Sequence, residues 1–158
     1  MADNFNEHQG YKEIMMGRRE KFYIAGSFRK LNTIKRISDV LEDCGCQQTY
    51  DWSENPVKSD LKILQTIANK EYQGINDCDF FVFVFPGGKG ANAEFGIATA
   101  LGKPIYIFDT TDQVKNPEKT STFYLMSHVH SFHGTVDAFK DYFINEVSRK
   151  SFHSVSDK

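Results

Sequence analysis

An unbroken apolar run, Phe80–Phe85 (FFVFVF), constrains this chain more than any other feature, and the glycine-rich segment PGGKG follows it directly. A run of this kind, rich in Phe and Val, is typical of a central parallel strand that is buried on both faces. The next segment, ANAEFGIATALG, predicts an apolar, alanine-rich helix over residues 91–101. The single charged residue of that segment is Glu94, which this prediction places in the first helical turn.

Strands and helices alternate along the rest of the chain. The remaining predicted strands cover 22–26, 48–52, 104–108 and 129–132, and the remaining helices 34–44, 59–76, a short one in TSTFYLMS, and 136–147. This alternation predicts an α/β three-layer sandwich, flavodoxin- or Rossmann-like, with a five-stranded parallel sheet of order 2-1-3-4-5. In that order the carboxyl ends of strands 1 and 3 flank the switch point where ligands bind. The loops GSFRK and PGGKG, which follow those two strands, are therefore expected to meet.

Length and composition favour one domain. The chain has 158 residues, of which 25% are charged and 40% hydrophobic, as in ordinary globular proteins. We expect the domain to cover residues 21–148, with a flexible arm at 1–20 and a tail at 149–158. The net charge of −2 gives no electrostatic case for binding a nucleic-acid polymer or a membrane surface.

The cellular compartment is predicted from what the sequence lacks. No apolar stretch reaches the roughly 20 residues of a membrane span, and the amino terminus has no apolar signal region. The three cysteines (Cys44, Cys46 and Cys78) are odd in number and lack metal-ligand spacing, so they are interpreted as reduced thiols. We expect a cytoplasmic protein that does not bind membranes.

Two glutamates are candidates for chemistry because their neighbours in the sequence are apolar. Glu71 falls within the apolar arc of the predicted helix 59–76, where a carboxylate must be paired or must open into a cleft. A buried ion pair with Lys or Arg, or escape to solvent at a helix end, would also explain it. Glu94 could simply complement a helix dipole, or it could be an ionised nucleophile that the helix amino terminus keeps deprotonated. Two carboxylates that meet at one crevice suit glycosidic chemistry.

The GSFRK loop supplies groups that suit an anion. Gly26 permits close backbone approach, Ser27 offers a hydroxyl, and Arg29 offers a planar cationic fork suited to phosphate. An ordinary capped loop with a solvated Arg is the alternative. The PGGKG loop has neither Walker A spacing nor a GxGxxG fingerprint, although its glycines and Lys89 could line an anion pocket.

Other candidates rank lower. His128, His130 and His133 could share a strand face, but no acidic cluster accompanies them and we expect no metal site. Tyr50 and Trp52 end the predicted second strand, where they could stack on a base or form the edge of the core. Asp51 lies between them and could be a turn residue.

Together these residues resemble the nucleoside 2-deoxyribosyltransferase-like superfamily, which includes 2′-deoxynucleoside 5′-monophosphate N-glycosidases and CMP hydrolases. The likeness runs from about residue 21 to residue 143 and rests chiefly on FYIAGSFR, EYQGINDCDFFVFVFPGG and AEFGIATALGKPIYIF. The resemblance implies that Glu94 is the nucleophile, that Tyr23 orients it, and that Glu71 is the second acidic residue. This chain departs from the family pattern at Glu71, where Asp is usual. It departs again at Gly88 and Lys89, where the glycosidases have a phosphate-binding Ser.

The resemblance also implies a substrate site, an assembly and a reaction. The expected substrate-binding residues are Gly26, Ser27, Phe28, Arg29, Trp52, Gly88, Lys89, Gly90 and Asn92. No cofactor is expected, and the partner expected besides the nucleotide or nucleoside substrate is a second copy, in a homodimer or higher homo-oligomer. The predicted reaction is N-glycosidic cleavage of a nucleoside 5′-monophosphate or nucleoside. The alternatives are base exchange by a deoxyribosyltransferase and a non-catalytic nucleotide-binding sensor.

Overall fold

The predicted sheet is present in the structure, a computed structural model that describes residues 19–56 and 60–153, the side chains of 148–153 excepted. Five parallel strands lie in the order β2-β1-β3-β4-β5, as predicted. Their bounds are β1 (Lys21–Ala25), β2 (Gln47–Gln48), β3 (Phe80–Phe85), β4 (Ile105–Asp109) and β5 (Val129–His133). The expected arm (1–20) and tail (149–158) lie mostly outside the described residues.

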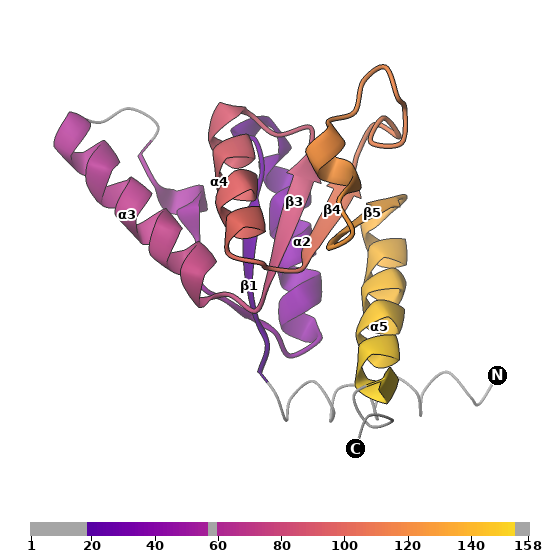
Figure 1. The fold of residues 1–158 in the computed structure, drawn as a ribbon. Helices are drawn as coiled ribbons and strands as arrows, with labels where there is room; N and C mark the ends of the chain where they lie inside the picture. Colours follow the sequence, from indigo (N-terminus) through magenta and orange to yellow (C-terminus); the bar gives the residue numbers. More distant parts are fainter. Residues whose placement is uncertain (1–18, 57–59, 154–158) are drawn as a thin grey trace.

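Helices cover both faces of this sheet (Figure 1). α2 (Leu31–Asp43) packs beside α5 (Val136–His153) on one face, and α3 (Leu61–Asp77) packs beside α4 (Lys89–Ala100) on the other. All six residues of β3 are buried between the two helix layers. The continuous apolar run of this strand is thereby explained, because side chains on both of its faces leave water.

The register of the sheet brings the two predicted loops together. Ala25, the last residue of β1, pairs with Phe83 of β3, so the two strands end at the same edge of the sheet. Gly26 follows directly, and a Cβ placed on it would lie 3.2 Å from Val84 Cβ and 2.7 Å from Ile34 Cδ1. A larger residue would therefore push the loop after β1 away from β3, which explains the glycine there.

Most element boundaries differ from the prediction by one to three residues, and β2 and α5 differ by more. β2 ends at Gln48 rather than residue 52, because the Asp51 side chain accepts a hydrogen bond from the Ser53 amide and starts the 3₁₀ helix η2 (Trp52–Glu54). α4 begins at Lys89 rather than residue 91, and α5 continues to His153 rather than 147.

The prediction that the apolar arc of the long helix faces the core is wrong for most of α3. Ile75 is buried, whereas Leu61 is 85% exposed, Ile63 45% and Tyr72 50%. Figure 1 shows the reason: the amino-terminal part of α3 projects away from the sheet. A helix of 17 residues is about 25 Å long, longer than the five-residue strand β1 that it crosses.

No helix in the described part of the chain combines the length and the hydropathy that a membrane crossing requires.

Candidate active site

The candidate site is built around Tyr23, in the middle of the buried strand β1. Its ring is fully buried and stacks on Phe81 of β3, with ring centroids 5.6 Å apart. The hydroxyl is buried as well and has no partner that meets ordinary hydrogen-bond geometry, although the Glu94 carboxyl lies close enough to interact with it. Burial, and then the charges of Glu94 and Glu71, raise the pKa of Tyr23 far above its usual range. The phenol therefore keeps its proton and is a donor for a carboxylate.

Glu94 reaches this hydroxyl from the second turn of α4. Burial, followed by the charge of Glu71, raises the pKa of Glu94 to about 8, and only the Tyr23 hydroxyl opposes the shift. The expectation that the helix amino terminus keeps Glu94 deprotonated is therefore wrong for the unliganded protein. The helix begins at Lys89, so Glu94 lies beyond the first turn, where the effect of the dipole is weak.

Glu71 comes to the same place from α3. It is partly buried, and burial raises its pKa. Its charge acts on both Tyr23 and Glu94, so the three groups are neighbours. The alternative of a buried ion pair at Glu71 finds no partner among the described residues, where the ion pair present joins Lys35 to Glu54.

Gly74, one turn after Glu71, allows this approach. A Cβ on Gly74 would lie 2.9 Å from Tyr50 Cβ and 3.1 Å from Tyr23 Cδ2. The absence of a side chain lets α3 pack directly against the Tyr23 ring. The Gly74 carbonyl also accepts a hydrogen bond from Thr49 Oγ1 at 2.8 Å. Sequence reasoning missed Gly74, although a glycine inside a helix costs about 1 kcal/mol relative to alanine and is a signal in itself.

With a pKa of about 8, Glu94 keeps most of its proton near neutral pH, and the pKa of its neighbour Glu71 is raised by burial as well. One of the pair can then attack or stabilise a cationic carbon while the other gives a proton to a leaving group. A neutral phenol beside them can orient the ionised oxygen by donating to it.

The GSFRK loop forms a second group of candidates at the carboxyl end of β1. The Ser27 hydroxyl accepts a hydrogen bond from the Arg29 amide at 3.3 Å and so caps the 3₁₀ helix η1 (Phe28–Lys30). The Arg29 side chain is exposed and makes no hydrogen bond or ion pair within the described part of the chain. The guanidinium is thus free to bind an anion. The same exposure also agrees with the alternative, an ordinary capped loop with a solvated Arg.

Trp52 and Phe28, both expected to bind substrate, lie against each other. Trp52 is buried, and its indole Nε1 donates to the Ile24 carbonyl at 2.6 Å, so its ring is part of the core edge. Phe28 packs edge-on against it, with ring centroids 5.0 Å apart, and is 48% exposed. The aromatic face open to a ligand is therefore that of Phe28, with Trp52 as its support.

The PGGKG loop leads into the start of α4. Gly88, Lys89 and Gly90 are exposed at the amino end of the helix, where backbone amides point outward. The amide of Asn92, expected to bind substrate, is instead engaged within the protein. Its Nδ2 donates to the carbonyls of Gly88 at 2.9 Å and Gly87 at 3.3 Å, and its Oδ1 accepts from the Tyr124 hydroxyl.

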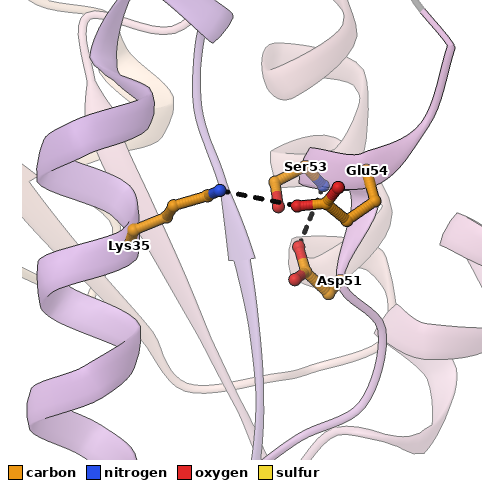
Figure 2. A network of polar contacts seen from close by, with 4 residues as sticks. All are labelled: Lys35, Asp51, Ser53 and Glu54. Carbon is orange, nitrogen blue, oxygen red and sulfur yellow. Dashed lines mark hydrogen bonds and ion pairs between the residues drawn. The ribbon is translucent and has the colours of Figure 1, made fainter.

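The residues around η2 form a separate polar network (Figure 2). Lys35 Nζ lies 3.5 Å from Glu54 Oε1, and Asp51 Oδ1 accepts from the Ser53 amide at 2.9 Å. Asp51 is thus a turn residue, one of the interpretations left open by the sequence.

The three histidines are held by different neighbours. His128 Nε2 lies 3.4 Å from Thr99 Oγ1, His133 Nδ1 lies 2.7 Å from the Asp109 carbonyl, and His130 stacks on Tyr106. A search of the described residues finds no group of three His, Cys, Asp or Glu side chains suited to a metal.

The sequence matches the family described as nucleoside 2-deoxyribosyltransferase over residues 22–143. No curated protein sequence matches this chain.

Solved structures share the fold at low sequence identity. A 2-deoxyribosyltransferase from Bacillus psychrosaccharolyticus is 19% identical, with a TM-score of 0.62 over 77% of this chain and 91% of that one. The CMP N-glycosidase BcmB of Clostridium botulinum is 20% identical, with a TM-score of 0.54 over 78% of this chain and 98% of that one. A conserved protein from Enterococcus faecalis V583 is 14% identical, with a TM-score of 0.54 over 83% and 98% of the two chains.

Proposed function

This chain belongs to the nucleoside 2-deoxyribosyltransferase family, and from that premise we propose that it cleaves the N-glycosidic bond of a nucleoside 5′-monophosphate or nucleoside, with Glu94 as nucleophile. The family makes it an enzyme of the nucleoside glycosidase or deoxyribosyltransferase type, which acts on nucleosides or nucleotides. The single observation that carries the proposal is the meeting of Tyr23, Glu94 and Glu71 at one buried point.

In the proposed mechanism the glycosidic bond breaks through an oxocarbenium-like transition state. The C1′–N bond electrons leave with the base, which takes the proton held by the glutamate pair, and Glu71 delivers that proton. The growing positive charge at C1′ favours the ionised form of Glu94, which then forms the covalent glycosyl-enzyme. The Tyr23 hydroxyl donates to the Glu94 carboxylate and aligns it. Water releases the sugar in a hydrolase, and a second base accepts it in a transferase.

A 5′-monophosphate fits the loop after β1 better than an uncharged 5′-hydroxyl. The free guanidinium of Arg29 and the hydroxyl of Ser27 lie two residues apart at the start of η1 and suit a phosphate group. Gly88, Lys89 and Gly90 lie after the neighbouring strand β3 and are proposed to complete the site. We assign the base to the exposed ring of Phe28, which Trp52 supports from below.

The proposal is tested by chromatography of the purified protein with a panel of nucleoside 5′-monophosphates and nucleosides. We expect the wild type to release free base and Glu94→Ala to release none while still binding nucleotide. Asp137→Ala, an exposed acidic residue of the first turn of α5, is the matched control and should retain activity. If the wild type releases no base from any compound, the proposal fails.

Base exchange is the first alternative, and the same assay with added free adenine or cytosine decides it. A transferase forms a new nucleoside, whereas a hydrolase leaves the sugar free. The second alternative is a nucleotide sensor, which the departures at Glu71 and Gly88 motivate. A sensor would bind nucleotide saturably without releasing base, and Glu94→Ala would bind as the wild type does.

We also propose that the protein forms a homodimer or a higher homo-oligomer. Leu61, Ile63 and Leu64 on α3 are exposed to an extent that is unusual for neighbouring aliphatic side chains. A second copy that covers this face would remove them from water and would lie beside the helix that carries Glu71. Light scattering of the wild type and of an α3 variant tests this proposal, as argued in the Discussion.

We also propose that the protein is cytoplasmic. Cys44, Cys46 and Cys78 are free and buried in the structure, and free thiols persist where the compartment is reducing. Cell fractionation checks this, and recovery of the protein outside the cytoplasm would contradict it.

A further inference from the structure

Asn92 clips the amino end of α4 to the turn before it. Its Nδ2 donates to the carbonyls of Gly87 and Gly88, which lie in the connection (residues 86–88) between β3 and the helix. Gly88 is the N-cap of α4, and as a glycine it offers no capping side chain. The side chain of Asn92 does not replace that cap, because it donates rather than accepts, but it joins the carbonyls of the turn to the helix.

Tyr124 holds Asn92 in that orientation. The Tyr124 hydroxyl donates to Asn92 Oδ1, which leaves the two amide protons of Asn92 for the carbonyls. Burial raises the pKa of Tyr124, so the hydroxyl stays protonated and remains a donor. Tyr124 lies on the 3₁₀ helix η3 (Thr122–Leu125), between β4 and β5 and far from Asn92 in the sequence.

The ring of Tyr124 is fixed as firmly as its hydroxyl. It packs against Phe83, Phe85 and Phe95 at centroid distances of 5.7, 5.5 and 5.1 Å. The neighbouring side chains Phe123 and Leu125 are 63% and 60% exposed, so Tyr124 is the aromatic residue of η3 that turns inward.

The contacts of Tyr124 flank the nucleophile. Asn92 and Phe95 are three residues apart and share one side of α4, and Glu94 lies between them in the sequence and reaches Tyr23. We propose that Tyr124 is a positioning residue, which acts through Asn92 to hold the Gly87–Gly88 turn and the first turns of α4, and so sets where Glu94 meets the reacting carbon. This inference rests on the proposed function.

The expected effect falls on the chemical step rather than on substrate affinity. Tyr124 and Asn92 would leave the substrate untouched and would act on the alignment of Glu94, and small misalignments of a reacting group slow the reaction strongly. Loss of the alignment that one hydrogen bond maintains is expected to slow the chemical step by roughly 3- to 10-fold.

The experiment compares Tyr124→Phe with the wild type in steady-state kinetics. The phenylalanine keeps the ring contacts and removes the hydroxyl, so the fold should be retained. We expect kcat to fall by about 3- to 10-fold while KM stays within about 2-fold. Asn92→Ala should lower kcat to a similar degree, and the double variant should fall little further, because both changes break one chain of hydrogen bonds. Tyr142→Phe, which removes a hydroxyl from an aromatic cluster on α5, is the control and should behave as wild type.

A second readout does not depend on turnover. The pKa of Glu94, followed by NMR of ¹³C-labelled glutamate, should move toward its ordinary value in Tyr124→Phe, since a loosened helix end admits water to the carboxyl. An inactive wild type with such a shift would refute the proposed function and leave the positioning role standing. An active wild type with neither kcat nor this pKa changed in Tyr124→Phe would overturn the positioning role. A change confined to KM would overturn it as well, because it would mark a substrate contact.

Discussion

Ionisation of Glu94 is unfavourable in the folded protein, and at the scale of single residues this predicts how stability depends on pH. Its pKa is about 8 when folded and about 4.3 in an unfolded chain. Between these values the folded state binds more protons than the unfolded state, so the free energy of unfolding falls as pH rises. Glu94→Gln removes this loss. We expect the variant to gain on the order of 1–3 kcal/mol at pH 8.5 and little at pH 4.5.

Thermal unfolding of both proteins across this pH range measures the effect. Glu118→Gln, in an exposed loop, is the control and should unfold in parallel with the wild type at every pH. A Glu94→Gln curve that also runs parallel to the wild type would contradict this prediction, because the carboxyl would then ionise as easily in the folded protein as in the unfolded chain.

The aromatic pair after β1 predicts two substitutions with opposite effects. Phe28→Ala removes an exposed ring, so stability should change little, whereas lost stacking on the base should raise KM by about 10-fold. Trp52→Phe leaves the Ile24 carbonyl without its donor and should cost about 1–3 kcal/mol of unfolding free energy, with a smaller effect on KM. Denaturant unfolding and steady-state kinetics separate the two. Equal losses of stability in both variants would contradict this division of roles.

Sequence reasoning at the residue scale proposed the glutamates and Tyr23 as candidates but did not find the hydrogen-bond partners of Trp52 and Asn92. The apolar context of Glu71 and Glu94 is local and visible in the sequence. The hydrogen bond from Trp52 to Ile24 and the bond from Tyr124 to Asn92 join residues 28 and 32 positions apart. Neither partner could be recognised from periodicity or from spacing, because the contacts are set by tertiary packing.

At the scale of elements, the close approach of α3 to β1 depends on Gly74. Gly74→Ala should gain about 1 kcal/mol in helix propensity but lose about 1–3 kcal/mol by overpacking, because its Cβ would lie 2.9 Å from Tyr50 Cβ. The atom that must move is rigidly attached to the backbone, so we expect α3 to shift and Glu71 with it. Activity should therefore fall by about 10-fold or more.

The control is Gly96→Ala on α4, where an added Cβ would meet nothing within 4 Å. That variant should keep its stability or gain slightly through helix propensity. Kinetics and thermal unfolding of the two variants provide the comparison. If Gly74→Ala were as active and as stable as Gly96→Ala, the approach of α3 would not depend on the missing side chain.

Element types could be predicted from the sequence better than their ends and faces. The buried run of β3 and the helix after it are strong local signals, and the structure has both. The prediction of β2 was too long because aromatic residues favour strands, whereas the Asp51 cap decides in favour of a 3₁₀ turn. The sequence shows that one face of α3 is apolar. The amino-terminal part of this helix nevertheless extends past the sheet, so that its apolar residues have no core to pack against.

At the scale of the whole molecule, the strand order of the sheet is the feature that could be predicted best from the sequence. The order β2-β1-β3-β4-β5 follows from the alternation of elements and from right-handed crossovers. It places the ends of β1 and β3 side by side, which is why residues from two distant loops could be expected at one edge. Whether a second copy covers α3 depends on the assembly, and the topology of a single chain does not predict it.

The exposed face of α3 predicts how the assembly responds to a single charge. Burying Leu64 against a second copy would contribute about 1.5–3 kcal/mol, and Leu64→Asp would lose this and bury a carboxylate besides. We expect the wild type to scatter light as a dimer or larger particle and Leu64→Asp to shift toward the monomer. Asn69→Asp adds the same charge at an exposed position about 140° around the helix from Leu64 and should leave the assembly intact. A wild type that is monomeric at assay concentrations would refute the proposed assembly, and equal dissociation of both variants would attribute the effect to charge rather than to this apolar face.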